Sequence, residues 1–187
     1  VCDEIAYNNH DIQDGIRAKK ISIEQLENLS IFSDQMKIIL KKYPKLSGSK
    51  IVNETVRLII NLLVTDLINN TKKNIKNESI SCVSDVKNFN ALIVSFSDDI
   101  KKLSMELKRF LYANLYQHPD VVKMTNQADI IIKNLFAAYT SDIKLLSNDF
   151  YQYNLDKINS GFKERVICDY IAGMTDRFAQ QEYKKLF

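Results

Sequence analysis

Apolar residues recur at intervals of three and four along most of the chain, which is the spacing of one face of an α-helix. The pattern is most regular over residues 54–75, where one face carries Val56, Ile59, Ile60, Leu63 and Leu67. Leu58 and Leu62 widen that face. Such a broad apolar surface predicts a helix that packs against more than one neighbour.

Four further segments are predicted to be helical. Residues 3–11 fit one helix, and residues 99–117 carry apolar residues at helical spacing: Ile100, Leu103, Leu107, Phe110, Leu111 and Leu115. Pro119 suits the first turn of the next helix, which runs through ADIIIKNLFAAY. The last helix is expected to start near Gly161 and to continue to the end of the chain.

Local signals predict where several helices begin and end. Ser22 and Gln25 have the spacing of a capping box, which predicts a helix from about Ile23. Pro44 and the following LSGSK predict a loop, because proline removes a hydrogen-bond donor. The polar stretch NTKKNIKNES, residues 70–79, is expected to be a loop or a frayed helix end.

Together these patterns predict an all-α fold. No segment alternates apolar and polar residues with period two, no internal repeat is evident, and only four Gly and two Pro interrupt the 187 residues. We expect one helical domain over residues 1–187, with more than about 60% of residues helical.

Composition narrows the class of protein. The chain is 45% hydrophobic and 26% charged, which is typical of a globular domain, and its net charge of +3 is small for a dedicated nucleic-acid binder. No apolar run reaches membrane-spanning length and no signal peptide is visible. Cys2, Cys82 and Cys168 lack CxxC spacing, so we expect reduced core thiols in a cytoplasmic protein.

The stretch DEIAYNNHD gathers unusual polar chemistry near the start of the chain. Asp3, Tyr7 and Asp11 are spaced by four residues, so on a helix they form one ridge that could line a cleft, with Asp3 able to ligate a cation. The alternative interpretation is a solvated acidic face on which Tyr7 keeps its hydroxyl in water.

Two later stretches share this polarity. LYQHPD places Tyr116 and His118 at a helix end, and CDYIAGMTDR sets Asp169, Tyr170 and Asp176 around Gly173. Glycine within a helix costs about 1 kcal/mol relative to alanine, so that glycine predicts the close approach of a backbone or ligand. The ordinary alternatives are an interface tyrosine and a charged pair on a helix surface.

Common catalytic motifs are absent from the sequence. There is no GxSxG elbow, Walker loop or GxGxxG segment, which argues against the usual hydrolase and nucleotide-binding folds. His10 and His118 have neither HxxxH nor HxxE spacing, so a self-contained metal site is not expected.

Three blocks carry a family resemblance along the whole chain. DEIAYNNHDIQDGIRA, FLYANLYQHPDVV and RVICDYIAGMTDRFAQQEY resemble, in this order, segments of the bacterial HD-domain deoxyguanosine triphosphate triphosphohydrolases, the dGTPase family. The resemblance implies a metal-dependent enzyme that cleaves a dNTP, most characteristically dGTP, to the deoxynucleoside and inorganic triphosphate. It also implies homo-oligomers and single-stranded DNA as a possible partner.

The resemblance assigns Asp3 to the metal site. Asp3 matches the last of four ligands that hold a divalent ion of the Mg, Mn or Co type in that family, so residues 1–20 would end the metal-site segment. The other three ligands, a His and a His-Asp pair, are expected upstream of Val1. We therefore expect residues 1–187 to be the C-terminal half of such an enzyme and to be inactive alone.

The same resemblance implies a sugar pocket. Tyr7 and Asp11 match positions that face the deoxyribose, where Asp11 would accept a hydrogen bond from the 3′-hydroxyl. Tyr116 resembles the tyrosine that stacks on the sugar and would crowd a 2′-hydroxyl. His118 completes a YQH segment that recurs in the related vertebrate dNTPase with SAM and HD domains.

Phosphate and base contacts follow less directly from the family pattern. The vertebrate enzyme has a Lys directly after its metal-binding Asp, whereas this chain has Glu4, so phosphate contacts are expected from Lys108 and Arg109. The block DYIAGMTDR implies contacts near the base or ribose for three further residues: Asp169, Tyr170 and Asp176. The alternative hypothesis for the whole chain is a helical regulatory or oligomerisation module without chemistry of its own.

Overall fold

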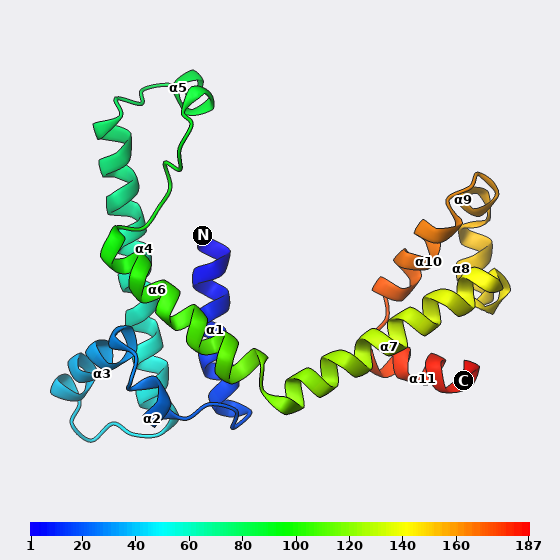
Figure 1. The fold of residues 1–187 in the computed structure, drawn as a ribbon, viewed down its shortest axis with the longest axis horizontal. Helices are drawn as coiled ribbons and strands as arrows, with labels where there is room; N and C mark the ends of the chain where they lie inside the picture. Colours follow the sequence, from blue (N-terminus) through cyan, green and yellow to red (C-terminus); the bar gives the residue numbers. More distant parts are fainter. The chain divides into compact units, whose positions relative to one another are not determined.

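The computed structural model describes all residues from 1 to 187 and confirms the all-α prediction. Helices hold 78% of the residues and no strand is present. The elements in chain order (Figure 1) are α1 Cys2–Arg17, α2 Ile23–Leu26, α3 Ser30–Lys42, α4 Ser49–Asn77, α5 Val83–Asn88, α6 Asp98–Leu111, the π-helical turn η1 Tyr112–Tyr116, α7 Pro119–Ser141, the 3₁₀ turn η2 Ile143–Leu145, α8 Asn148–Tyr153, α9 Leu155–Asn159, α10 Lys163–Ala172 and α11 Asp176–Leu186.

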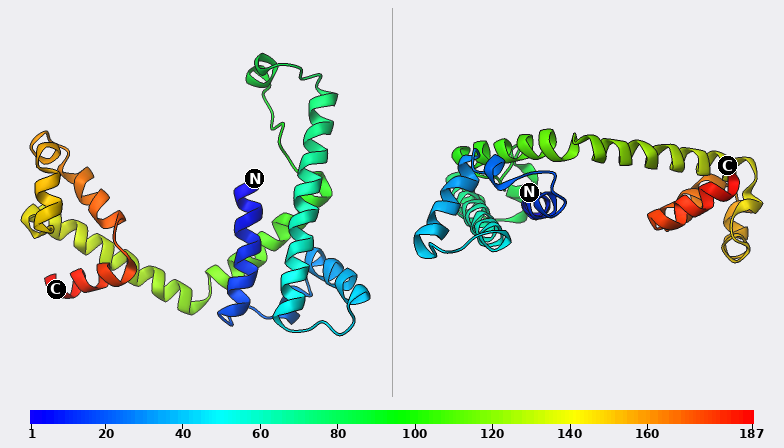
Figure 2. Two further views of the ribbon diagram at one scale, coloured as in Figure 1. Left: turned by 180° about the vertical axis from the view of Figure 1, so that it is seen from behind. Right: turned by 90° about the horizontal axis from the view of Figure 1, so that it is seen from below.

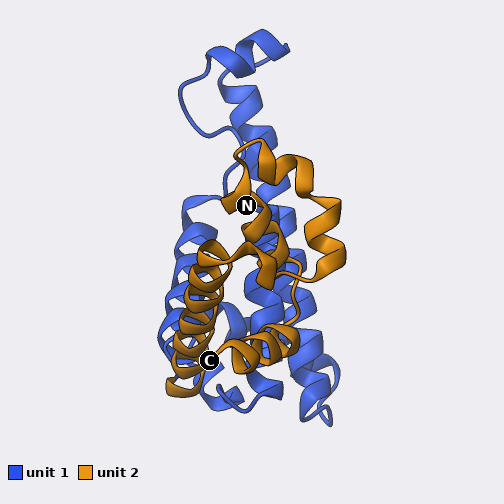
Figure 3. Cartoon of the chain, turned by 90° about the vertical axis from the view of Figure 1, so that its right-hand side faces the viewer, with its two compact units in different colours: residues 1–118 blue, residues 119–187 orange.

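The chain divides into two compact units, Val1–His118 and Pro119–Phe187, which are coloured separately in Figure 3. Each unit has its own cluster of buried apolar side chains. We therefore describe the fold of each unit by itself.

In the first unit α4 packs against both α1 and α3 (Figure 1, Figure 2), as the broad apolar face of residues 54–75 predicted. Ile59 and Leu63 of α4 are buried together with Ile12 of α1 and Phe32 of α3. The α6 helix closes the same core through its buried side chains, Ser104, Leu107 and Leu111. This packing fixes α1 and α6 on one scaffold.

The prediction of a loop or frayed end over residues 70–79 was wrong, because α4 continues through most of this segment. Two of its asparagines have partners in the chain that returns from α5. The Asn70 amide donates to the backbone carbonyl of Ser95 at 2.9 Å, and the Asn74 amide donates to that of Ile93 at 2.9 Å. Hydrogen bonds to a distant segment thus stabilise a helical stretch that looks like a loop in sequence.

The predicted start of the helix after residue 22 is confirmed. The Ser22 hydroxyl accepts from the Gln25 backbone N–H at 3.3 Å, and the Gln25 side chain accepts from the Ser22 N–H at 2.9 Å. The loop predicted around Pro44 is also present, between α3 and α4.

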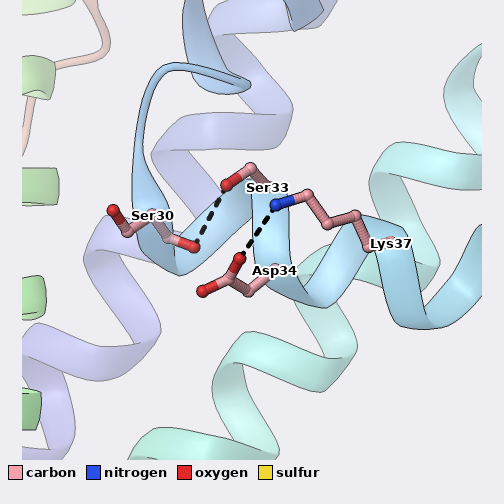
Figure 4. Close-up of polar contacts among 4 residues, drawn as sticks. All are labelled: Ser30, Ser33, Asp34 and Lys37. Carbon is pink, nitrogen blue, oxygen red and sulfur yellow. Dashed lines mark hydrogen bonds and ion pairs between the residues drawn. The ribbon is translucent and has the colours of Figure 1, made fainter.

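The outer face of α3 shows an ordinary solvated polar pattern (Figure 4). The Ser33 hydroxyl donates to the Ser30 carbonyl at 3.4 Å, and the Lys37 ammonium lies 3.2 Å from the Asp34 carboxylate. The Lys37 and Asp34 side chains are 73% and 64% exposed, so their pair contributes only about 0.3–0.5 kcal/mol. All four residues are near neighbours on one helix, unlike the polar contacts of the candidate site described below.

The second unit is built on α7, which packs against α10 and α11. Leu135, Tyr139 and Ile167 are fully buried in its core. The expected single last helix was wrong: the chain forms α10 and α11, because the Thr175 hydroxyl accepts from the Phe178 N–H at 3.3 Å and starts a new helix.

The close approach predicted at Gly173 was also wrong. This glycine ends α10 with a φ of −80°, and a Cβ there would lie 3.5 Å from the nearest atom, the Asp169 carbonyl oxygen. The tight position is Gly15 in α1, where a Cβ would lie 2.8 Å from Ile21 Cδ1. Glycine at this position lets the chain fold back directly after α1.

The cysteine prediction was wrong in one respect. All three cysteines are free thiols, but each is exposed rather than part of a core. No helix is both long enough and apolar enough to cross a membrane.

Candidate functional site

The polar ridge predicted on the first helix meets the end of α6 in the structure. The Tyr116 hydroxyl, in η1, donates a hydrogen bond to the Asp11 carboxylate of α1, across 105 residues of sequence. The ring of Tyr7 lies 6.3 Å from the ring of Tyr116, centre to centre, with 31° between their planes. Tyr116 and Asp11 are half-buried, whereas Tyr7 is 57% exposed. The three side chains therefore form one cluster that is open to solvent on the Tyr7 side.

The π-helical turn η1 sets the position of Tyr116. The Gln117 N–H donates to the Tyr112 carbonyl at 3.0 Å, which is the i to i+5 bond of a π-helix. Such turns are rare and occur frequently at functional sites. Sequence periodicity gave no sign of it, because η1 simply continues the apolar pattern of α6.

The environment of Tyr116 keeps its phenol protonated. Burial raises the pKa of Tyr116 well above its ordinary value of 10, and the hydrogen bond to the Asp11 carboxylate and the nearby Tyr7 raise it further. The hydroxyl is thus a constant donor at neutral pH, and Asp11 is held as its acceptor.

We expect Tyr116 to ionise later than the exposed tyrosines in an alkaline titration. Because its pKa is higher in the folded than in the unfolded chain, its stabilising contribution is complete below about pH 10 and is lost as the pH rises through the folded value. The measurement is phenolate absorbance against pH. Burial and the Glu182 carboxylate also raise the pKa of Tyr139. The wild type should therefore show two tyrosines that ionise late, Tyr116 and Tyr139, and Tyr116→Phe should show only one. Unchanged late absorbance in Tyr116→Phe would contradict the assignment.

A second polar link joins the same two helices. The Lys108 ammonium of α6 lies 2.9 Å from the Glu4 carboxylate of α1, with the side chains 62% and 40% exposed. Lys108 and Arg109 also line a surface hollow of about 340 Å³ together with Met105 and Tyr112. The predicted cationic residues therefore border an open space on the surface of α6 and η1.

The two links lie at opposite ends of one strip. Glu4 and Asp11 are about two helical turns apart on α1, or roughly 10 Å, and Tyr7 lies between them. One end of the strip carries cations and the other carries a carboxylate and a phenol. Sequence reasoning predicted Lys108, Tyr116 and the ridge, but it missed Glu4 as a pairing partner.

His118 is half-buried directly after η1, and its backbone N–H donates to the Leu115 carbonyl at 3.1 Å.

Three predicted residues belong to the second unit. Asp169 pairs with Arg165 at 2.9 Å on the surface of α10. Tyr170 packs in an aromatic cluster, with its ring centre 4.7 Å from that of Phe150. Asp176 is the exposed first residue of α11.

The side chains of this chain do not by themselves fit a metal centre. No group of three or more His, Cys, Asp and Glu side chains comes together in a way that could hold an ion. Asp3 is exposed in the first turn of α1 and is able to supply one ligand only.

Comparison with known proteins shows what the chain is similar to. The phosphohydrolase-associated domain matches residues 94–185. Deoxyguanosinetriphosphate triphosphohydrolase-like proteins of Thiobacillus denitrificans and Nitrosomonas europaea are 41% and 40% identical to the chain over all 187 residues. One from Geobacter sulfurreducens is 40% identical over 185 residues. The chain is thus similar to dGTPase-like proteins over its whole length. It spans about half the length of these relatives, 48%, 48% and 47% respectively.

The family match covers both sides of the cluster. The phosphohydrolase-associated domain includes α6 and η1, with Lys108 and Tyr116, and the similarity to dGTPase-like proteins extends over α1 as well. The resemblance of the three sequence blocks to this family is thereby confirmed.

Proposed function

We propose that this chain provides the sugar- and phosphate-binding part of a metal-dependent dNTP triphosphohydrolase, with dGTP as the substrate. The observation that supports this best is the hydrogen bond from Tyr116 to Asp11 with Tyr7 alongside, which joins two of the family-like sequence blocks in one cluster. In this proposal residues 1–187 correspond to the C-terminal half of the enzyme.

The Asp11 end of the strip is suited to a deoxyribose. The Asp11 carboxylate has further lone pairs that can accept a hydrogen bond from a 3′-hydroxyl. The Tyr116 ring offers a flat apolar surface for the sugar, and its hydroxyl is fixed by Asp11. A 2′-hydroxyl would meet this ring, so the same contact discriminates against ribonucleotides by steric clash.

The Lys108 end is suited to phosphates. Lys108 supplies a point charge, and Arg109 supplies a planar fork of donors that matches phosphate oxygens. Both line the same surface hollow on α6 and η1. The separation of roughly 10 Å along α1 would leave room for the sugar and the phosphate chain on one ligand.

The proposed activity requires a divalent ion, of the Mg, Mn or Co type, that this chain does not hold alone. We assign Asp3 as one of its ligands and residues 1–20 as the end of the metal-site segment. Because a single carboxylate does not make a binding site for such an ion, residues 1–187 alone are expected to be inactive. Three further points stay predictions. They are base contacts by Asp169, Tyr170 and Asp176, a homo-oligomeric assembly, and the binding of single-stranded DNA.

The proposal is tested by product analysis. Hydrolysis would add one water across the bond between the α-phosphorus and the 5′-oxygen, which yields the deoxynucleoside and inorganic triphosphate. The full-length natural protein that contains residues 1–187 should therefore convert dGTP, with a divalent metal ion, to deoxyguanosine and triphosphate. Release of pyrophosphate or orthophosphate as the first product would refute the proposed reaction.

A further inference from the structure

Glu4 pairs with Lys108, one of the two cations to which the proposed function assigns phosphate binding. Its carboxylate lies 2.9 Å from the Lys108 ammonium, and the two residues belong to different helices, α1 and α6. The neighbouring Arg109 has no acidic partner in the structure. The two candidate phosphate-binding cations therefore differ: Lys108 is held by the protein itself and Arg109 is not.

We propose that Glu4 competes with the phosphates of the ligand for Lys108 and so sets how tightly this site holds a polyphosphate. The inference rests on the proposed function, in that it takes Lys108 as a phosphate-binding residue. It adds a residue, Glu4, that determines affinity without touching the ligand.

The geometry makes this competition energetically effective. Both side chains are substantially exposed, so the pair is weak enough to open when an anion arrives. Once Lys108 turns to the anion, the Glu4 carboxylate loses its partner while a second negative charge lies close by. The ligand must offset both the lost pair and the repulsion between like charges.

Removing the Glu4 charge should therefore strengthen anion binding. We expect Glu4→Gln to bind inorganic tripolyphosphate about two- to five-fold more tightly than the wild type, the factor that corresponds to an exposed ion pair. The gain should shrink as salt is added, because exposed charges are screened. Isothermal titration calorimetry on residues 1–187 at low ionic strength measures both effects.

A matched control separates the local pair from net charge. Asp99 forms an exposed ion pair with Lys102, at 3.7 Å, within α6 itself. Asp99→Asn changes the net charge as Glu4→Gln does, but it leaves Lys108 paired. We expect its affinity for tripolyphosphate to equal that of the wild type, and an equal gain in both variants would overturn the inference.

The test is completed by introducing Glu4→Gln into variants that lack one of the two cations, Lys108 or Arg109. The gain from Glu4→Gln should disappear in Lys108→Ala and persist in Arg109→Ala. If Lys108→Ala weakens binding while Glu4→Gln equals the wild type, competition by Glu4 is wrong and the phosphate-binding role of Lys108 stands. If Lys108→Ala has no effect in either background, the phosphate-binding role is wrong and the inference falls with it.

Discussion

Replacing Tyr116 with alanine is expected to lower dNTP hydrolysis by the full-length protein about tenfold or more and to raise its relative use of GTP. The substitution removes both the surface that supports the sugar and the steric block against a 2′-hydroxyl. The measurement is kcat/KM for dGTP and for GTP in both proteins. Equal discrimination by the variant and the wild type would contradict the placement of the sugar against this ring.

The conservative variant separates the ring from the hydroxyl. Tyr116→Phe keeps the aromatic surface and loses the hydrogen bond to Asp11. We expect it to keep most of its selectivity against GTP, with a moderate loss of kcat/KM because Asp11 is no longer oriented. A Phe variant as unselective as the Ala variant would show that the hydroxyl, and not the ring, discriminates.

Asp3→Ala is expected to abolish triphosphate release by the full-length protein, with a loss of at least about 100-fold, while the helical fold survives. Asp3 is exposed at the start of α1 and the structure gives it no hydrogen-bond or ion-pair partner. Its loss should therefore change the free energy of unfolding by no more than about 1 kcal/mol, from the charge at the helix N-terminus. Circular dichroism and thermal unfolding measured beside the activity assay test both halves of this expectation.

Asp14→Ala is the matched control on the same helix. Asp14 is also an exposed acid of α1, but its partner is Arg17 at 3.3 Å. We expect this variant to keep wild-type turnover. Wild-type turnover in Asp3→Ala as well would remove the metal-ligand assignment and favour the hypothesis of a helical regulatory or oligomerisation module.

The helices were largely predictable because they bury a continuous apolar face. The pattern around Ile59 and Leu63 required a partner on each side, and α1 and α3 provide them. The capping box at Ser22 was equally readable, since both of its hydrogen bonds are local. The extension of α4 past residue 70 was not, because Asn70 and Asn74 are satisfied by a segment that only the fold brings close.

The candidate site was predictable on one helix at a time. Spacing by four placed Asp3, Tyr7 and Asp11 along α1, but nothing in that spacing shows that Asp11 meets Tyr116 105 residues later. The Glu4 pair with Lys108 has a separation of 104 residues and was hidden for the same reason.

Residues of the second unit show the opposite difficulty. Tyr170 looked like a ligand-binding residue in its polar block, yet its ring packs 5.6 Å from that of buried Tyr139. A polar neighbourhood in sequence does not reveal which side of a helix faces the core. The break between α10 and α11 also depended on a hydroxyl, that of Thr175, whose capping bond a continuous helix pattern conceals.

A crystal structure of the full-length natural protein with a non-hydrolysable dGTP analogue tests the central claim most directly. The account predicts the sugar against the Tyr116 ring, its 3′-hydroxyl within hydrogen-bonding distance of the Asp11 carboxylate, and the phosphates toward Lys108. A nucleotide bound elsewhere, with Tyr116 and Asp11 still bonded only to each other and facing solvent, would contradict it.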